Sequence, residues 1–129
     1  MSQFAGTWQF ASSDHLEELL RAIGMNEDFI AKSRDDKPAM TITVSDNNIH
    51  LKTEGRAGIL EESLTFNVRS ERKSPTEKTT MIKESDTRMK AVFTGTANPA
   101  HTIYEICGNE LHVTSTAGGV TSKAIFVKA

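Results

Sequence analysis

The side chains of this chain that are able to do covalent or metal chemistry are few and scattered. The single cysteine is Cys107, and the four histidines, His15, His50, His101 and His112, include no pair at helical ligand spacing. Cys107 stands beside a turn signal with no paired His–Asn pattern, which favours an ordinary free thiol over a nucleophile. We therefore expect no catalytic residue, no metal site and no cofactor.

Two carboxylate pairs and one glycine pair also fail to make a reactive site. The neighbours in Glu17-Glu18 and in Glu61-Glu62 face different ways on a helix or strand, so neither pair is a ready acid–base couple. Gly118-Gly119 has no following helix, so it predicts a hairpin turn and not a phosphate loop. The residue types in this chain thus favour binding over catalysis.

The composition indicates one soluble domain, residues 1–129. Asp and Glu number 17 against 15 Lys and Arg, the net charge is -2, and 37% of the residues are hydrophobic. A nucleic-acid binder usually carries a basic surplus, so we expect no nucleic-acid partner. No apolar run reaches the roughly 20 residues of a membrane helix, and the first residues lack the pattern of a secretory signal. With one cysteine and no glycosylation sequon, we expect a cytoplasmic monomer.

One region near the N-terminus predicts two short helices. Residues 15–23 place an apolar residue at i, i+3, i+4 and i+7, with Ser13 or Asp14 as the expected cap and Gly24 as the stop. The second helix is expected to begin after Asn26 and to fade near Ser33. Gly24 and Met25 between them predict a tight helix-turn-helix.

The rest of the chain predicts strands that alternate with turns. The expected strands cover residues 5–12, 38–45, 49–54, 59–67, a weaker 69–73, 78–84, 87–94, 100–107, 110–116 and 120–128. Neighbours joined by short turns pair antiparallel, so about ten such strands form an up-and-down sheet. A sheet of that size hides its edges best by closing into a barrel. A barrel wider than eight strands encloses a cavity, and the helices are placed to lid one end.

Several segments carry a resemblance to a known family. They are Phe4-Ala5-Gly6-Thr7-Trp8-Gln9, Ile23-Gly24-Met25-Asn26-Glu27-Asp28-Phe29-Ile30, Arg34-Asp35-Asp36-Lys37-Pro38, Gly108-Asn109-Glu110-Leu111 and Gly118-Gly119-Val120-Thr121. Over its whole length the chain resembles the intracellular lipid-binding proteins, which include fatty-acid-binding, retinoid-binding and liver bile-acid-binding members. The first and last segments are most like the liver branch. The resemblance implies a mainly β, ten-stranded antiparallel barrel of the lipocalin-like, or calycin, type with a helix-turn-helix lid. It also implies a buried lipid cavity and no catalysis.

One departure from the family pattern bears on the ligand. Most fatty-acid-binding members hold the ligand carboxylate with an Arg-x-Tyr pair on the last strand and a second Arg two strands earlier. The matching positions here are Ala124, Phe126 and Tyr104, and none is cationic. A carboxylate buried without a partner is strongly disfavoured or takes up a proton. We expect a ligand held mainly by apolar contact, with its head on hydroxyl groups or toward the portal.

Alternation of side chains along the strands predicts the residues that line the cavity. The predicted ligand-binding residues are Tyr104, Phe126, Thr102, Ile106, Leu111, Val113, Ser115, Ser122, Ala124, Met40, Ile42, Leu51 and Thr53. Those expected around the portal are Ile23, Met25, Phe29, Ile30, Arg56, Ala57, Lys73 and Pro75. Basic residues on and after the helices, Arg21, Lys32 and Arg34, suggest transient membrane contact through the lid. Trp8 is expected to be structural.

The expected function is therefore intracellular binding and transport of a hydrophobic ligand, with a long-chain fatty acid as the main hypothesis. A bile acid, a sterol-like molecule or a retinoid is the alternative, suggested by the missing carboxylate anchor and the liver-like opening. Two other classes stay open. One is an enzyme that acts on a small lipid through Cys107 or a His–Glu pair, and the other is a protein-interaction barrel with a filled interior.

Overall fold

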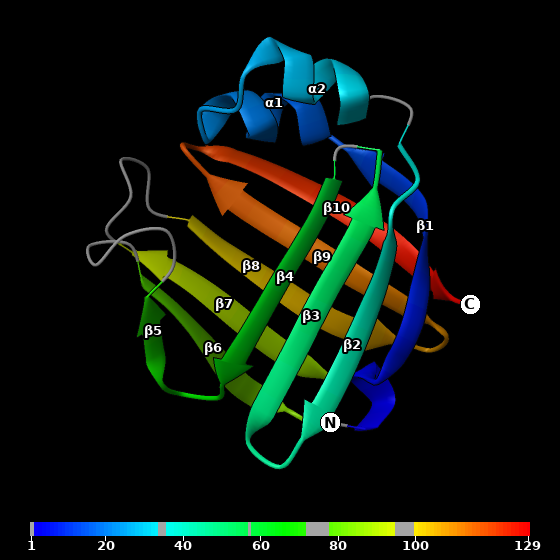
Figure 1. Cartoon of the computed structure of the whole chain (residues 1–129), viewed down its shortest axis with the longest axis vertical. Helices are drawn as coiled ribbons and strands as arrows, with labels where there is room; N and C mark the ends of the chain where they lie inside the picture. Colours follow the sequence, from blue (N-terminus) through cyan, green and yellow to red (C-terminus); the bar gives the residue numbers. More distant parts are fainter. Residues whose placement is uncertain (1, 34–35, 57, 72–77, 95–99) are drawn as a thin grey trace.

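The computed structural model describes residues 2–33, 36–56, 58–71, 78–94 and 100–129. The helical segments are η1 (Ser2–Phe4), α1 (Leu16–Ala22) and α2 (Glu27–Ser33). The strands are β1 (Gly6–Asp14), β2 (Ala39–Ser45), β3 (Asn48–Gly55), β4 (Gly58–Thr65), β5 (Arg69–Glu71), β6 (Lys78–Ser85), β7 (Arg88–Thr94), β8 (Ala100–Cys107), β9 (Glu110–Ala117) and β10 (Val120–Lys128). The two α-helices lie across one end of the curved sheet (Figure 1).

All strands belong to one antiparallel sheet in the order β4-β3-β2-β1-β10-β9-β8-β7-β6-β5. From β2 to β4 and from β5 to β10, consecutive strands pair with one another. β1 pairs with β2, which follows the helices, and with β10, which joins the two ends of the chain. Among the described residues β4 and β5 form no ladder. Only a bridge between Phe66 and Met81 and a hydrogen bond from Asn67 N to Met81 O (2.7 Å) connect the two sides there. The barrel is therefore nearly closed, and the expectation of full closure is corrected.

The predicted strands are confirmed in position, with one difference in size. In the described part of the chain, nine strands have seven to nine residues, whereas β5 has only three. β8 and β10 have the expected bounds, and β2 begins one residue after Pro38. A β-bulge lies between Phe10 and Ser12 of β1. It shifts the alternation of side chains along the last part of that strand.

The helix pair follows the sequence prediction except at its start. α1 begins after His15, which has the left-handed φ of 52°, and no side chain caps the helix, so the predicted cap by Ser13 or Asp14 is wrong. Gly24 ends the helix as predicted, with φ 86° and its N–H donated to Arg21 O. Met25 N–H donates to Leu20 O at 2.9 Å, which completes a Schellman motif. Asn26 Oδ1 accepts from Phe29 N–H at 2.8 Å and caps α2, also as predicted.

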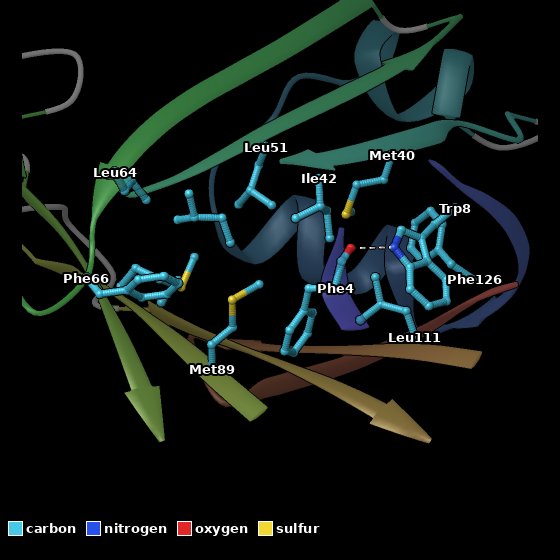
Figure 2. Close-up of a cluster of buried hydrophobic side chains, with 13 residues drawn as sticks. Phe4, Trp8, Met40, Ile42, Leu51, Leu64, Phe66, Met89, Leu111 and Phe126 are labelled. Atoms are coloured by element: carbon cyan, nitrogen blue, oxygen red, sulfur yellow. Dashed lines mark hydrogen bonds between the residues drawn. The ribbon is translucent and has the colours of Figure 1, made fainter. Parts of the chain in front are cut away.

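A buried apolar cluster fills the barrel end opposite the helices and part of its middle (Figure 2). Phe4, in η1, closes this end and is completely buried. Its carbonyl oxygen accepts a hydrogen bond from Trp8 Nε1 at 2.9 Å, so the buried indole donor is satisfied. Trp8 was predicted to be structural, and its hydrogen-bond partner is the Phe4 carbonyl oxygen. The plug formed by Phe4 has no repeating pattern in the sequence and was not predicted.

Replacing Phe4 by Ala is expected to lower the free energy of unfolding by about 3–5 kcal/mol, because it leaves a cavity in the closed end of the barrel. Urea unfolding followed by Trp8 fluorescence measures the change. Gln3→Ala, an exposed neighbour in η1, is the matched control and should change stability by less than about 0.5 kcal/mol. A loss below about 1 kcal/mol in Phe4→Ala would show that η1 is not a plug.

Thr79 on β6 gives a second prediction, in which a substitution raises the free energy of unfolding instead of lowering it. Its side chain is buried, and its Oγ1 is the one buried side-chain oxygen or nitrogen among the described residues that makes no hydrogen bond. Thr79→Val keeps the shape and removes the unpaired hydroxyl, so stability should rise by about 1–2 kcal/mol. Thr80→Val on the adjacent outward position is the control, and both are read by thermal unfolding. Destabilisation by Thr79→Val would mean that the hydroxyl has a hydrogen-bond partner in solution.

Candidate functional site

The register of the sheet determines which side chains face the barrel interior. Tyr104, Val113 and Ala124 lie side by side across β8, β9 and β10, and Leu111 pairs with Phe126 one step nearer the plugged end. All five belong to the buried cluster or pack against it. The same holds for the predicted inner-face residues Met40, Ile42, Leu51 and Ile106. The structure thus brings these nine residues together on one surface.

This inner surface is not filled by its own side chains. Tyr104, Val113, Ser115 and Ala124 are only half-buried, although each faces inward. By contrast, Leu111 at the plugged end is completely buried. Side chains that face the interior and still have accessible surface must border open space. The space lies between the plugged end and the helices.

Three hydroxyl side chains form a row across the inner face of β8, β9 and β10. Thr102 pairs with Ser115, and Ser115 pairs with Ser122. The Thr102 and Ser115 oxygens are 3.1 Å apart and share one hydrogen bond. Ser122 Oγ donates to Asp14 O at 2.6 Å. All three were predicted to face inward, but the row that they form depends on a register that the sequence does not specify.

Asp14 fastens the end of β1 to β10 beside this row. Besides its carbonyl bond with Ser122, its carboxylate Oδ1 accepts a hydrogen bond from Lys123 N–H at 2.9 Å. This backbone donor is the main reason why the pKa of Asp14 is lowered, with a smaller contribution from His15. At pH values above the ordinary pKa of an Asp side chain, the Asp14 carboxylate is therefore ionised and its hydrogen bond to Lys123 N–H is kept.

Among the described residues, no cation on the inner face lies next to the apolar cavity. On the described inner-face positions of β1–β4 and β6–β10, the charged side chains are Glu62, opposite Leu51, Lys83, opposite Met89 near the β6–β7 turn, and Lys128 at the plugged end. Lys128 Nζ donates to Ala5 O at 2.7 Å and lies 4.5 Å from the Trp8 ring centroid, outside the open space. Within the described residues, the space is bordered mainly by apolar and hydroxyl groups, together with the carboxylates of Glu62 on the inner face and Asp36 at the mouth.

An apolar cavity of about 290 Å³ lies between the helices, the β3–β4 hairpin and β10. Leu16, Leu20 and Phe29 border it from the helices, and Ala124 and Phe126 border it from the inner face. Phe10 and Phe126 meet edge to face with ring centroids 5.7 Å apart. Ala124 also belongs to the half-buried inner face and lies two residues from Ser122 of the hydroxyl row, although no member of the row borders the cavity itself. Thr53 borders the cavity as well.

The mouth of this cavity exposes large apolar side chains. Leu60 pairs with Thr53 on the inner face of β4 and is nevertheless 67% exposed, which shows that the barrel is open beside it. Ile59, which also borders the cavity, is 61% exposed. Ile23, at the end of α1, is 41% exposed but is not among the residues that border the cavity. Of these three, only Ile23 was predicted at the portal. Ile59 and Leu60 looked like ordinary strand residues in the sequence.

Asp36 ties the segment after α2 to the β3–β4 hairpin across the mouth. Its Oδ1 accepts a hydrogen bond from Arg56 N–H at 3.0 Å, and its own N–H donates to Ser33 O at 3.2 Å. The carboxylate lies so close to Gly55 that a Cβ on Gly55 would overlap it. Asp36 thus acts as a clasp at the cavity mouth, and the sequence analysis assigned it no such role.

The remaining predicted portal residues have different positions. Phe29 borders the cavity as expected, Met25 is half-buried and Arg56 is exposed. Ile30 is the completely buried residue of α2, so it packs the helix against the protein and is not exposed at the portal opening. Three predicted portal residues, Ala57, Lys73 and Pro75, lie outside the described residues.

A second hollow of about 460 Å³ lies between β1 and the helices. It shares Phe10, Leu16, Ser33 and Asp36 with the apolar cavity, but it also has polar and acidic residues such as Glu17. A hydrocarbon chain gains more from the apolar cavity, because transfer of apolar surface out of water is the main favourable term. We therefore take the apolar cavity as the candidate site.

The groups considered for catalysis lie away from this cavity. Cys107 is exposed at the end of β8. The two His–Glu pairs, His50 with Glu61 and His112 with Glu110, have nitrogen–oxygen distances of 3.0 Å and lie on the outer face of the barrel. Within the described part of the chain no group of three His, Cys, Asp or Glu side chains is arranged to hold a metal. No helix there is long and apolar enough to cross a membrane.

Comparison with known proteins agrees with this architecture. The fatty acid-binding protein of Clonorchis sinensis is 30% identical over 127 residues, which cover 95% of each chain. Fatty acid-binding protein 1 of Fasciola gigantica is 27% identical over 132 residues and the whole of both chains. The solved structure of a Schistosoma mansoni fatty acid binding protein in complex with arachidonic acid superposes with a TM-score of 0.92, at 20% identity, over 100% of this chain and 98% of that one. No family model matches the sequence.

The nearly closed barrel with its two helices is thus the fold of the Schistosoma mansoni protein along the whole chain. Identity of 30% over nearly all of both sequences is more than fold similarity alone. The protein belongs to the intracellular lipid-binding protein family, which includes the fatty-acid-binding proteins.

Proposed function

We propose that this protein binds a long-chain lipid inside its barrel and carries it between membranes or partners, with a fatty acid as the main candidate. The observation that carries the proposal is the apolar cavity under the lid, which opens at Leu60 and continues onto a half-buried inner face. Its 290 Å³ is at the small end of ligand sites, so a long chain must also occupy the inner face. Relatives named as fatty acid-binding proteins support this reading.

The ligand is proposed to bind without the Arg-x-Tyr anchor found in most fatty-acid-binding members. Ala124 and Phe126 occupy the corresponding positions, and both border the cavity. Each buried methylene contributes about 0.8 kcal/mol, so the tail can supply most of the binding free energy. Bile-acid, sterol-like and retinoid ligands remain alternatives within the same proposal, and the liver-like resemblance remains a prediction. We propose no catalytic activity and no nucleic-acid partner.

Membrane contact, if it accompanies transfer, is proposed to use apolar side chains at the mouth more than basic ones on the lid. Arg21 is engaged by acids, with its Nε 3.1 Å from Glu27 Oε1. The two described helices carry four acidic residues, Glu17, Glu18, Glu27 and Asp28, against the bases Arg21 and Lys32. An anionic bilayer gains little from such a lid. Ile59 and Leu60 are exposed apolar residues that border the opening, and Ile23 is exposed at the end of α1.

The proposed function predicts that the purified protein retains a stoichiometric lipid or binds one after delipidation. Native mass spectrometry followed by organic extraction identifies what is bound. Adding oleate to delipidated protein should raise the melting temperature, because a ligand at 100 times its Kd adds about 2.7 kcal/mol of stability. Competition between oleate and a bile salt for one fluorescent probe separates the two ligand classes. No bound lipid and no shift with any of them would contradict the proposal.

The Asp36 clasp predicts faster ligand exchange when it is removed. Asp36→Ala loses the bond to Arg56 N–H, so opening of the mouth becomes easier. Association and release of a fluorescent fatty acid should both speed up about two- to tenfold, as expected for one hydrogen bond, with little change in Kd. Stopped-flow mixing measures both rates.

Asp36→Asn is the matched control for this experiment, because an amide oxygen can still accept the Arg56 hydrogen bond. Its exchange rates should remain near those of the unmodified protein. Equal rates in the Ala variant and the unmodified protein would show that Asp36 does not control the opening.

A further inference from the structure

The hydroxyl row of Thr102, Ser115 and Ser122 has an unequal supply of hydrogen-bond donors and acceptors. Thr102 and Ser115 share one hydrogen bond, so one of their two protons remains uncommitted. Ser122 has already given its proton to Asp14 O, but its oxygen keeps lone pairs. The row therefore offers one free donor and several acceptors toward the interior.

This supply does not suit a carboxylate. A carboxylate only accepts hydrogen bonds and needs several donors or a cation to leave water. The described inner face bordering the open space has no Lys or Arg, and the charged side chain that it does carry, Glu62, is acidic. A group that both donates and accepts, such as an O–H, matches the row without a buried charge.

The position of the row supports a role in holding the head of a lipid. Ser122 lies two residues from Ala124 on the same face of β10, and Ala124 borders the apolar cavity. Ser115 is half-buried and gives the row its accessible surface toward the interior, whereas Thr102 and Ser122 are only 8% and 3% exposed. A chain in the cavity can thus reach the row with one end.

We propose that this row selects lipids with an uncharged, hydroxyl-bearing head group, either a long-chain alcohol or a fatty acid in its protonated form. The inference rests on the proposed function and specifies its ligand. The ligand O–H donates to the Ser122 oxygen, and the free proton of the Thr102–Ser115 pair is donated to the ligand oxygen. An ionised carboxylate of the same length binds more weakly.

The experiment compares oleyl alcohol with oleate on delipidated full-length protein, by displacement of one fluorescent probe at pH 6, 7 and 8. If only the protonated acid binds, its apparent Kd rises about tenfold per pH unit, because a carboxylic acid ordinarily titrates near pH 4–5. Oleyl alcohol does not titrate in this range, so any change of its Kd with pH comes from the protein. That change is subtracted from the change seen with oleate. Asp14 bonds to Ser122 and His15 follows it in the chain. The other titratable groups on elements that pack against the row are Glu17, Glu18 and Arg21 on α1, which contacts β9 and β10, and Tyr104 on the inner face of β8.

Paired variants assign the effect to the row. Thr102→Val with Ser115→Ala removes both partners of the shared bond, so no orphan hydroxyl remains, and should weaken oleyl alcohol about three- to tenfold. Thr121→Val, on the outward face of β10, should change nothing. Octadecene, which has no head group, should bind equally to both variants and to the unmodified protein, which shows that the cavity is intact.

The outcomes separate this inference from the function on which it rests. Failure of all these lipids to bind contradicts the proposed function itself. Oleate that binds more tightly than the alcohol with a pH-independent Kd leaves lipid binding in place and overturns the inference. An affinity for oleyl alcohol that is unchanged in the Thr102→Val, Ser115→Ala variant also overturns the inference. A Kd of oleate that rises with pH, together with tight binding of oleyl alcohol, supports the inference. The ratio of the two Kd values then shows whether the alcohol or the protonated acid is preferred.

Discussion

Closure of the barrel depends on the pairing of the first strand with the last. The other ladders in the described sheet join strands that are consecutive in sequence, β1 and β2 through the helix pair, whereas β1 must meet β10 more than a hundred residues later. Ser122 and Lys123 both bond to Asp14 at one end of this seam, and Lys128 bonds to Ala5 at the other. Without the seam, β1 and β10 would be the free edges of two separate sheets. It therefore holds the enclosed space, and loop-closure entropy opposes its formation.

The same seam determines where the interior is packed and where it is open. Near Trp8 it brings together the first residues of the chain, β2 and the end of β10, and Phe4 fills that end. Beyond the bulge at Phe10, β1 stays paired with β10 up to Asp14, and the chain then enters α1, so that the helices cross the other end of the sheet (Figure 1). One end is thus closed by a plug within the sheet, whereas the described residues that cover the other end are two seven-residue helices. Space for a ligand is left beneath the weaker cover.

Much of this was predictable from sequence because its causes are local. Turn residues such as Gly118-Gly119 and the alternation along β10 depend on neighbours in the chain, and both the hairpins and the inner faces of β8 to β10 were predicted correctly. The Asn26 cap was likewise a local signal. The Phe4 plug, the bulge and the Asp36 clasp join residues that are distant or irregular in sequence. The left-handed conformation of His15 also has a distant cause. Asp14 bonds to Lys123 of β10 and is therefore not available to cap α1.

In the proposed site the head group is held by hydroxyl groups and not by a buried cation, which changes how selectivity arises in such a barrel. A salt bridge in a low-dielectric interior rewards a charged head only after both charges have lost their water, so its net gain is small although removal of one partner is severe. A hydroxyl row carries a much smaller desolvation penalty and leaves the free protein without an unpaired buried charge. The head group then contributes little affinity, while the tail contributes most of it through burial. Discrimination among lipids of equal length must therefore come mainly from the desolvation of the head that each one brings. On that argument, a charge on the ligand is what an interior of this kind rejects.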